Sequence, residues 1–437
     1  MQSYAQRLSH PNGPILDAAR IDDGHLTRSP EDARTVSLKN RLNASGLPRT
    51  TWVLSVTALL VAIGFGVVIP VLTPFAKTFE ASNFQLGLVV SLFAAMRLIT
   101  SPFAPRIGRR LGERNAITLG VLIVAVSTVA TALAPTLEFM LIARGLGGIG
   151  SATFTISAIN LLLSTAPEHL RGRASGLYQG GFLLGNMTGP ALGGLLSGIS
   201  LEAPFYFYAA MLVVCAGFTF AMLPERAVPL DHQHKRTPRR FAEVLRDVRY
   251  QAACMVALGQ GWQSLGVRNA FIPLLVTEAL ILETYWTGIA FAIAAVAQTA
   301  MLIPAGNATD RIGRKPVMIA SGIVCGLAAI AMPFSTNIWI LIVVLCIYGM
   351  GAAMQGTAPT AAVADATQGR GGVPVAAFSM VMDLGSIFGP LVAGAVLDVW
   401  SFGVAFAIGG VILLAGSLYA AFIPRELDRE FLSIPRP

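Results

Sequence analysis

The feature that most constrains this chain is a series of twelve apolar windows, each long enough for a helix to cross a bilayer. A helix satisfies its own backbone hydrogen bonds, which a bilayer interior cannot do for it. Apolar residues make up 54% and charged residues 12% of the 437 residues, which excludes an ordinary soluble domain. We predict an all-α integral membrane protein with twelve transmembrane helices. The windows are 51–74, 83–104, 115–134, 137–163, 173–199, 204–223, 251–277, 285–306, 316–334, 338–363, 374–398 and 402–423.

The windows form two sets of six, separated by the longest internal polar stretch. We predict an N-terminal bundle at 50–223 and a C-terminal bundle at 250–424, joined by a cytoplasmic linker at 224–249. The end of this stretch, 241–250, is compatible with an amphipathic helix on the membrane surface. Residues 1–49 and 425–437 are polar, and we expect cytoplasmic tails, the first of them disordered.

Lysine and arginine are unevenly distributed between alternate loops, and this bias sets the orientation of a membrane protein. One set of loops holds only Lys77, so we place the other set, the linker and both termini in the cytoplasm of a multi-pass cell-membrane protein. Topology also accounts for the net charge of +8, and no motif suggests a nucleic-acid partner. The cytoplasmic set contains Arg106, Arg109, Arg110, Arg114, Arg171, Arg173, Arg311, Arg314, Lys315, Arg370, Arg425 and Arg429.

Signatures of catalysis and of cofactor binding are missing from the sequence. It has no HExxH, GxGD or GxxxxGK[ST] motif, and its four cysteines have no metal-ligand spacing. The tract Asp231-His232-Gln233-His234 is more typical of a solvated loop than of a metal site. We expect no enzyme activity, metal or cofactor, and an ion gradient as the energy source. A sensor on the same scaffold remains an alternative.

Short sequence motifs of the first half recur in the second half at nearly constant offsets, which indicates an internal duplication. Arg106-Ile107-Gly108-Arg109-Arg110 returns 205 residues later, Gly185-x-x-x-Gly189-Pro190 with Gly194 returns 200 residues later, and Ile69-Pro70 returns 203 residues later. Duplicated halves are typical of transporters in which one half rocks against the other around a central site.

Three longer motifs are present: Gly306-x-x-x-Asp310-Arg311-x-Gly313-Arg314-Lys315, Arg144-x-x-x-Gly148-x-Gly150-x-Ala152, and Gly185-x-x-x-Gly189-Pro190-x-x-Gly193-Gly194. The first matches in full the loop signature of the major facilitator superfamily, and the others resemble its second motif and its antiporter motif. The resemblance covers residues 50–424. It implies the fold of two pseudo-symmetric six-helix bundles, and a proton-coupled exporter of drug-like compounds.

The first-half loop departs from this signature, because Ser101 and Pro105 stand where glycine and aspartate are expected. In the family that carboxylate caps a helix of the opposite half and latches the cytoplasmic side closed. Asp310 alone is left for this role. We assign the latch to the loop residues Arg106, Arg109, Gly306, Asp310, Arg311, Gly313 and Arg314.

Four ionisable residues lie well inside the apolar windows: Arg97, Arg144, Arg268 and Asp383. Each costs about 2.5–3.5 kcal/mol or more to insert, so each needs a physical explanation. The repeat offsets place uncharged residues opposite all four, namely Leu302, Tyr348, Phe65 and Leu183. The duplicated architecture therefore does not require these charges, which leaves pairing between halves or recognition of a solute.

Arg97 in the second window and Asp383 in the eleventh lie at similar depth. We hypothesise an ion pair between the halves that replaces the missing latch carboxylate and holds the cytoplasmic side shut. Protonation of Asp383 would loosen this pair and connect a proton to the gate. A static pair without a role in coupling is the alternative.

Arg268 is accompanied on its helix by Gln260, Gln263 and Asn269, a set compatible with the lining of a wet cavity. It is a candidate anchor for an anionic or carbonyl-bearing solute, and a structural pairing is the alternative. Arg144 lies in a motif often tied to proton transfer. Window 51–74 has no carboxylate and no window has a histidine, so Asp383 is the preferred proton carrier.

The resulting prediction is a monomeric secondary transporter in the lipid bilayer that exports small, largely apolar molecules in exchange for protons. The alternative is a uniporter or importer of a sugar, organic acid or lipid-like solute, because the fold alone does not set direction.

Overall fold

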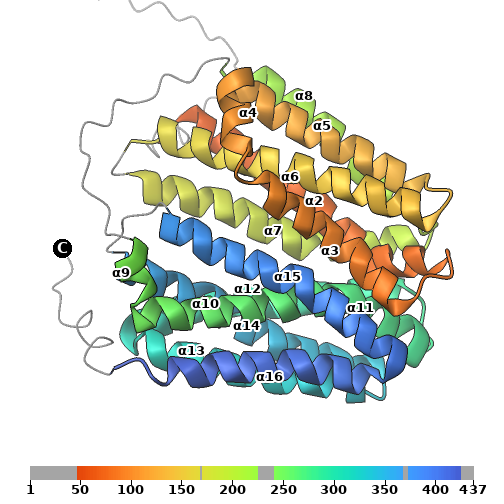
Figure 1. Ribbon diagram of the computed structural model, residues 1–437. Coiled ribbons are helices and arrows are strands. Elements are labelled where there is room, and N and C mark those ends of the chain that lie inside the picture. The colour runs from red at the N-terminus through yellow and green to blue at the C-terminus, as the bar shows by residue number, and fades with distance from the viewer. Residues whose placement is uncertain (1–46, 168–169, 225–240, 368–372, 425–437) are drawn as a thin grey trace, which may run out of the picture. The chain divides into compact units, whose positions relative to one another are not determined.

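The computed structural model describes residues 47–167, 170–224, 241–367 and 373–424, and all regular structure in these ranges is helical (Figure 1). The helices before the linker are α2 (Arg49–Lys77), α3 (Asn83–Thr100), α4 (Ala104–Leu111), α5 (Glu113–Ala132), α6 (Leu137–Thr165), α7 (Arg171–Ser197) and α8 (Ala203–Met222). Those after it are α9 (Phe241–Leu245), α10 (Val248–Gln260), η2 (Gly261–Val267), α11 (Arg268–Leu274), η3 (Leu275–Ala279), α12 (Tyr285–Arg311), α13 (Arg314–Ala331), η4 (Met332–Phe334), α14 (Ile338–Ala366), α15 (Val373–Val399) and α16 (Phe402–Ala420).

Ten helices of the described residues are long and apolar enough to cross a membrane. The predicted all-α membrane fold is confirmed, and each of the twelve windows lies on helical backbone. The two windows outside these ten are α7, which is rich in glycine, and the run from α10 to η3. The π-helical segments η2 and η3 divide that run into pieces of at most 13 residues.

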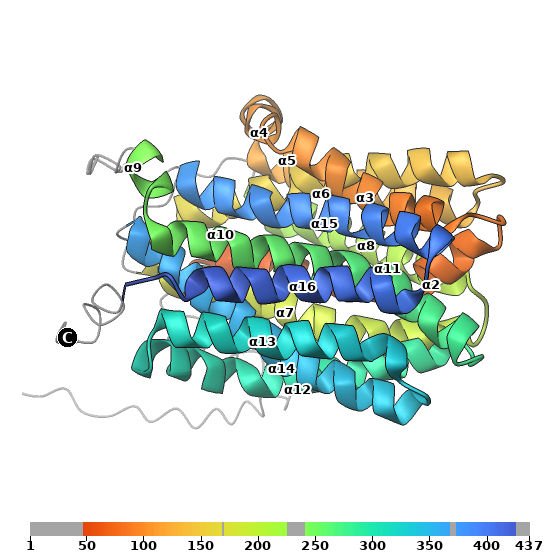
Figure 2. The same cartoon turned by 60° about the horizontal axis from the view of Figure 1, so that its bottom comes forward.

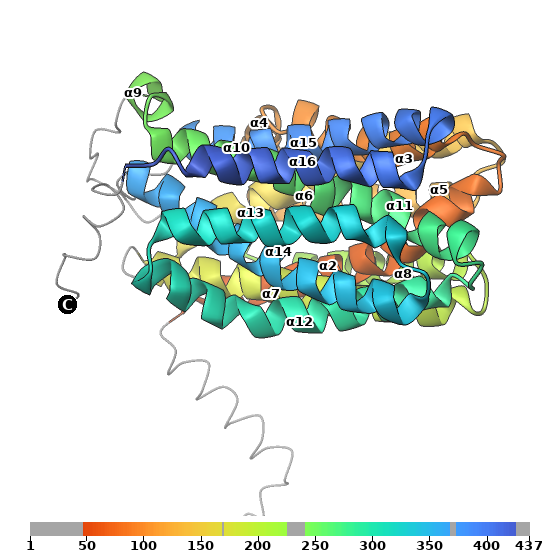
Figure 3. The ribbon, with the colours of Figure 1, turned by 90° about the horizontal axis from the view of Figure 1, so that it is seen from below.

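The helices group by their order in the chain (Figures 1 and 2). In the first group α2 packs against α7 and α8, and α5 packs against α6 and α8. In the second, α12 packs against α14, and α13 against α14 and α16, as the view from below shows (Figure 3). The groups meet mainly through three pairs: α3 with α15, α7 with α12, and α2 with α11. Helices far apart in sequence therefore form the contact between the halves.

The predicted tails and most of the linker lie outside the described residues. The helix expected over 241–250 is shorter, because α9 ends at Leu245 and α10 begins at Val248. Asp247 caps the N-terminus of α10 by accepting a hydrogen bond from the backbone N–H of Arg249. Val244 of α9 is buried, and the Tyr250 hydroxyl donates to the carbonyl of Pro374 at 2.7 Å.

The loop repeat needs a correction of four residues. Gly313 precedes α13 with φ 109°, and the residue that precedes α5 with a positive φ, 81°, is Gly112 and not Gly108. Gly108 lies inside α4. The recurring residues therefore give the wrong alignment of the two loops. The correct alignment pairs the glycines that make the turn, because that turn needs a positive φ, which glycine adopts readily. In the corrected register Arg109 stands opposite Asp310 and Gln298 opposite Arg97. The first-half loop still lacks the carboxylate.

Candidate functional site

The predicted pair between Arg97 and Asp383 is present in the structure. Arg97 Nη2 of α3 lies 2.8 Å from Asp383 Oδ1 of α15, with 36% and 10% of the two side chains exposed. Near it, the Ser91 hydroxyl of α3 donates to the carbonyl of Ile387 in α15 at 2.6 Å. The depth of the two windows was enough to predict this contact, since an unpaired charge at that depth is costly.

The halves touch closely at one end of the α7 and α12 pair. We call it the arginine-poor end, formed by loops 78–82, 133–136, 198–202, 280–284, 335–337 and 400–401, and the opposite end the arginine-rich end. A Cβ built at Gly288 of α12 would lie 2.5 Å from Gly194 Cα and 2.6 Å from the Pro190 carbonyl oxygen. A Cβ at Gly87 or Gly394 would clash with backbone atoms of Pro390 or Asn83, across α3 and α15. Only glycine permits this approach.

The arginine-rich end of the same pair is uncovered. A Cβ at Gly176 or Gly180 of α7, or at Gly306 of α12, meets no atom within 4 Å, and Gly356 of α14 is equally open. The halves are thus in contact at the arginine-poor end of α7 and α12 and leave the other end open. The ion pair of Arg97 and Asp383 is formed in this arrangement as well, so the pair alone does not close the arginine-rich end, and the latch role expected for it stays a prediction. α3 and α15 stay together through this pair while α7 and α12 are uncovered.

The antiporter-motif glycines divide into two groups. Gly185, Gly189 and Gly193 pack against the backbone of α2 in their own half, whereas Gly194 packs against Gly288 of the opposite half. The repeat keeps this division, because Gly385 and Gly389 pack on 258–262 of their own half and Gly394 packs on Asn83 across the interface. Pro190 lies inside α7, and its carbonyl oxygen is close to Gly288 of α12. Tight packing and interface contact are therefore functions of different glycines in one motif.

Sequence reasoning missed a carboxylate at the arginine-poor end. Asp398 of α15 accepts hydrogen bonds from the backbone N–H groups of Asn83 at 2.8 Å and Phe84 at 3.0 Å, the first residues of α3. It thus caps a helix of the opposite half, where its charge also suits the positive end of the helix. The one sequence feature that could have indicated this cap is the position of Asp398 in the last turn of α15. Lys77 and Glu278, 3.4 Å apart, join α2 to η3 nearby.

Replacing Asp398 by alanine should loosen the start of α3. Loss of a cap costs about 0.5–2 kcal/mol, so backbone amides of 83–88 should exchange hydrogen about 2- to 30-fold faster. Hydrogen–deuterium exchange with mass spectrometry measures this directly. Glu138→Ala, at an exposed carboxylate on the first turn of α6, is the matched control and should leave α3 unchanged. Unaltered exchange in Asp398→Ala would show that the cap contributes nothing.

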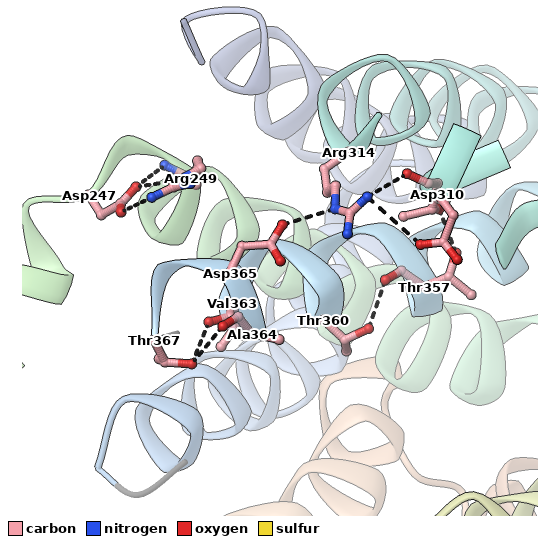
Figure 4. A network of polar contacts seen from close by, with 11 residues as sticks. Asp247, Arg249, Asp310, Arg314, Thr357, Thr360, Val363, Ala364, Asp365 and Thr367 are labelled. Atoms are coloured by element: carbon pink, nitrogen blue, oxygen red, sulfur yellow. Dashed lines mark hydrogen bonds and ion pairs between the residues drawn. The ribbon is translucent and has the colours of Figure 1, made fainter. Parts of the chain in front are cut away.

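The loop signature organises charges within its own half (Figure 4). Arg314 Nε lies 2.9 Å from Asp365 Oδ2 of α14, Arg314 Nη1 lies 3.8 Å from Asp310 Oδ1, and Nη1 also donates to the carbonyl of Thr309 at 3.0 Å. The expected contact of Asp310 with the opposite half is not seen among the described residues. Asp365, which the sequence placed merely near a span end, is the closest acidic partner of Arg314. Arg106, Arg109 and Arg311 are exposed.

Arg144 and Arg268 are half-buried, and each guanidinium lies over aromatic rings. Arg144 Cζ is 4.7 Å from the centroid of Phe93, and Arg268 Cζ is 5.6 Å and 5.5 Å from those of Phe291 and Tyr348. Among the described residues neither has a carboxylate within 4.0 Å or a hydrogen-bond partner, and both Nε atoms are buried and unbonded. They carry the two unpaired charges deep in the spans.

The polar companions predicted for Arg268 do not share one environment. Gln260 and Asn269 are half-buried, but Gln263 is fully buried against Gly409 of α16, and neither of its amide atoms has a partner. Gln263 lies inside η2, where hydrogen bonds run over five residues, such as that from the Arg268 N–H to the Gln263 carbonyl, so the α-helical spacing assumed in the prediction does not apply there.

Similar proteins are transporters. The chain is 24% identical to multidrug resistance protein 2 of Bacillus subtilis over 379 residues, covering 84% of this chain and 94% of that protein. It is 30% identical to quinolone resistance protein NorA of Staphylococcus aureus over 164 residues, 37% of this chain and 41% of that one. It is 28% identical to the bovine synaptic vesicular amine transporter over 267 residues, 60% of this chain, and spans half of that protein's length.

Solved structures agree at the level of the fold. The crystal structure of the D-xylose-proton symporter superposes with a TM-score of 0.70 at 16% identity, covering 86% of this chain and 98% of that one. A bacterial homologue of the human lysosomal transporter Spinster superposes with a TM-score of 0.64 at 18% identity, covering 88% and 98%. The sequence profile of the Major Facilitator Superfamily matches residues 54–280 and 264–435. The chain is thus a multi-pass membrane transporter of small molecules, not an enzyme, and belongs to the Major Facilitator Superfamily.

Proposed function

We propose that this transporter exports small, largely apolar molecules from the cytoplasm in exchange for protons, as a monomer in the cell membrane. The arginine-rich end is then cytoplasmic, together with both termini. The antiporter motif and the names of the bacterial relatives, which include multidrug and quinolone resistance, support export. The likeness to a sugar symporter concerns the fold alone, so import of a sugar, organic acid or lipid-like solute has no observation of its own in favour.

The ion pair of Arg97 and Asp383 is the observation that supports coupling. It joins the two halves while the end assigned to the cytoplasm is open. In this arrangement a proton has left Asp383 for the cytoplasm, and the charged carboxylate holds Arg97. A proton that arrives from outside, when the other end is open, neutralises Asp383 and releases Arg97. Loss of the proton on one side of the membrane and its binding on the other thus form and break this ion pair once in each transport cycle.

Arg144, which resembles a proton-transfer residue of the family, has no carboxylate beside it among the described residues. Its role in coupling therefore needs a proton carrier elsewhere, and Asp383 is the one carboxylate buried deep in the described spans. Release of Arg97 would weaken the contact of α3 with α15 and so ease the return of the halves to the arrangement that is open at the arginine-rich end. The loop residues around Arg314 would keep α12, α13 and α14 together during this motion.

Everted membrane vesicles with an acidic interior test this function. We expect them to accumulate at least one of a quinolone, ethidium and carboxyfluorescein, in a manner that requires the transporter. Nigericin, which collapses the pH gradient, should abolish accumulation, since no other energy source is proposed. Valinomycin with potassium, which collapses only the electrical potential, is the control. It should leave most of the accumulation of a compound without net charge, whereas that of an anion should fall in part, because an anion exchanged for a proton moves charge. Accumulation that survives nigericin would contradict proton coupling.

A further inference from the structure

We propose that the substrate carries an anionic group, a carboxylate or a phosphate, that binds at the guanidinium of Arg268 while its apolar body lies against neighbouring aromatic side chains. This inference rests on the proposed function and narrows its substrate class. It concerns equilibrium binding, which needs no gradient. A protein that bound anions without proton coupling would sustain it and contradict only the exporter mechanism.

The charges deep in the described spans do not balance. Arg97 is paired with Asp383, but Arg144 and Arg268 have no carboxylate within 4.0 Å among the described residues. The interior therefore holds two uncompensated cations. A buried unpaired charge is strongly unfavourable, which leaves water or an anionic ligand as the compensating partner. A cationic substrate would add to the imbalance, whereas an anion would reduce it.

The aromatic contacts of Arg268 leave its hydrogen-bond donors free. Phe291 of α12 and Tyr348 of α14 have ring centroids 5.6 Å and 5.5 Å from its Cζ. The guanidinium carries five N–H donors in its plane, and none of them has a hydrogen-bond acceptor among the described residues. The Tyr348 hydroxyl is already bonded to Ser264 at 2.6 Å, so the ring is held in place. This fixes a planar fork whose edge suits two oxygen atoms of one anionic group.

The backbone around Arg268 is also specialised. Its N–H donates to the Gln263 carbonyl, five residues earlier, at the end of the π-helical segment η2. Such segments are rare and are found frequently at functional sites. Gly266 packs on Pro390 as Gly66 packs on Pro190, so the position that corresponds to Arg268 in the first half is Val68 of α2. Because α2 is an uninterrupted helix, the duplicated fold needs neither the π segment nor the arginine. Both features are specific to this segment of the chain.

The two arginines occupy positions that the repeat does not relate to each other. In the structure Arg144 of α6 corresponds to Leu345 of α14, and Arg268 corresponds to Val68 of α2. Each half thus presents one arginine on an aromatic ring, from different helices. We assign the anchor to Arg268 because its guanidinium touches rings from two other helices of its half and is preceded by η2, whereas Arg144 touches one ring.

The test uses three probes with one aromatic body: 1-naphthylacetate, 2-(1-naphthyl)ethanol and 2-(1-naphthyl)ethylamine. Equilibrium dialysis against the purified full chain in nanodiscs at pH 7 gives a Kd for each. We expect the carboxylate to bind at least about tenfold more tightly than the amine, as expected for a charge-assisted contact. Arg268→Gln should remove this difference, and Arg268→Lys should keep part of it, since lysine keeps the charge without the fork.

The neutral alcohol shows whether a variant is folded, because its Kd should change less than about threefold in Arg268→Gln. Arg110→Gln, at an exposed arginine of α4, is the matched control and should leave all three Kd values unchanged. Three outcomes would overturn the proposal: an amine bound as tightly as the carboxylate, a carboxylate preference that survives in Arg268→Gln but is lost in Arg144→Gln, or no binding of any probe.

Discussion

Asp383→Asn should lose accumulation driven by a pH gradient by at least about tenfold, while exchange of substrate between equal concentrations on both sides continues. Asparagine resembles the protonated carboxyl group and leaves Arg97 without its charge-assisted bond, which is worth about 1.5–3 kcal/mol at a buried site and less here, since 36% of the Arg97 side chain is exposed. The protein would then change conformation without gaining or losing a proton at this position. Reconstituted liposomes measure both activities side by side.

Glu138→Gln, which neutralises an exposed carboxylate on α6, is the control and should retain both activities. The exchanged pair Arg97→Asp with Asp383→Arg should recover thermal stability relative to each single variant, because the opposite charges still meet. If Asp383→Asn loses exchange as well as accumulation, the pair is static and coupling lies elsewhere. An exchanged pair as unstable as either single variant would argue against a direct interaction in the membrane.

Gly288→Ala and Gly288→Leu should hold the transporter away from the conformation described here. Even the Cβ of alanine would lie 2.5 Å from Gly194 Cα, so α7 and α12 must separate at the arginine-poor end. Overpacking costs about 1–3 kcal/mol, which shifts a two-state population by about 5- to 150-fold. Transport should fall by a similar factor, and more for leucine than for alanine, because closing this end is a required step of alternating access.

Labelling of Ser91→Cys reports this opening. Ser91 is 1% exposed between α3 and α15, so a cysteine there should react with an impermeant maleimide only when the arginine-poor end opens. The four native cysteines are replaced by alanine in this background. Gly288→Ala should raise the labelling rate, whereas Gly217→Leu, where a Cβ meets nothing within 4 Å, should not. A rate unaffected by Gly288→Leu would mean that this contact does not close the end.

The charge of the substrate determines whether the compounds in the relatives' names indicate what this chain transports. The apolar windows and the antiporter motif are compatible with many drug-like compounds, but the two unpaired arginines disfavour cations. Relatives named for amines or drugs need carry no such charges, and identities of 24–30% leave room for this change. Membership of the family does not give the charge of the substrate, and the binding of the three naphthalene probes measures that preference directly.

The predictions from the sequence were most successful for features that depend only on the order of residues along the chain. Hydrophobic windows fix where helices cross a membrane, because the bilayer imposes a length and excludes unpaired backbone. The cost of charge in a bilayer identified Arg97 and Asp383 as partners. The predictions failed where the repeated sequence and the three-dimensional structure differ. The motif repeated at Arg106 misplaced the turn that Gly112 makes, and α-helical spacing misplaced Gln263, which lies inside a π-helical segment.

The sequence by itself determined the helical membrane fold, the duplication, the family motifs and the four intramembrane charges, since each follows from local composition or from repeated residues. Only the tertiary structure decided which end of the interface is closed, that Gly194 and Gly394 rather than their motif neighbours cross it, that Asp398 caps α3, and that Arg144 and Arg268 have no carboxylate beside them among the described residues. These are relations between helices far apart in the sequence, and they depend on how the two halves pack at a given moment of the transport cycle.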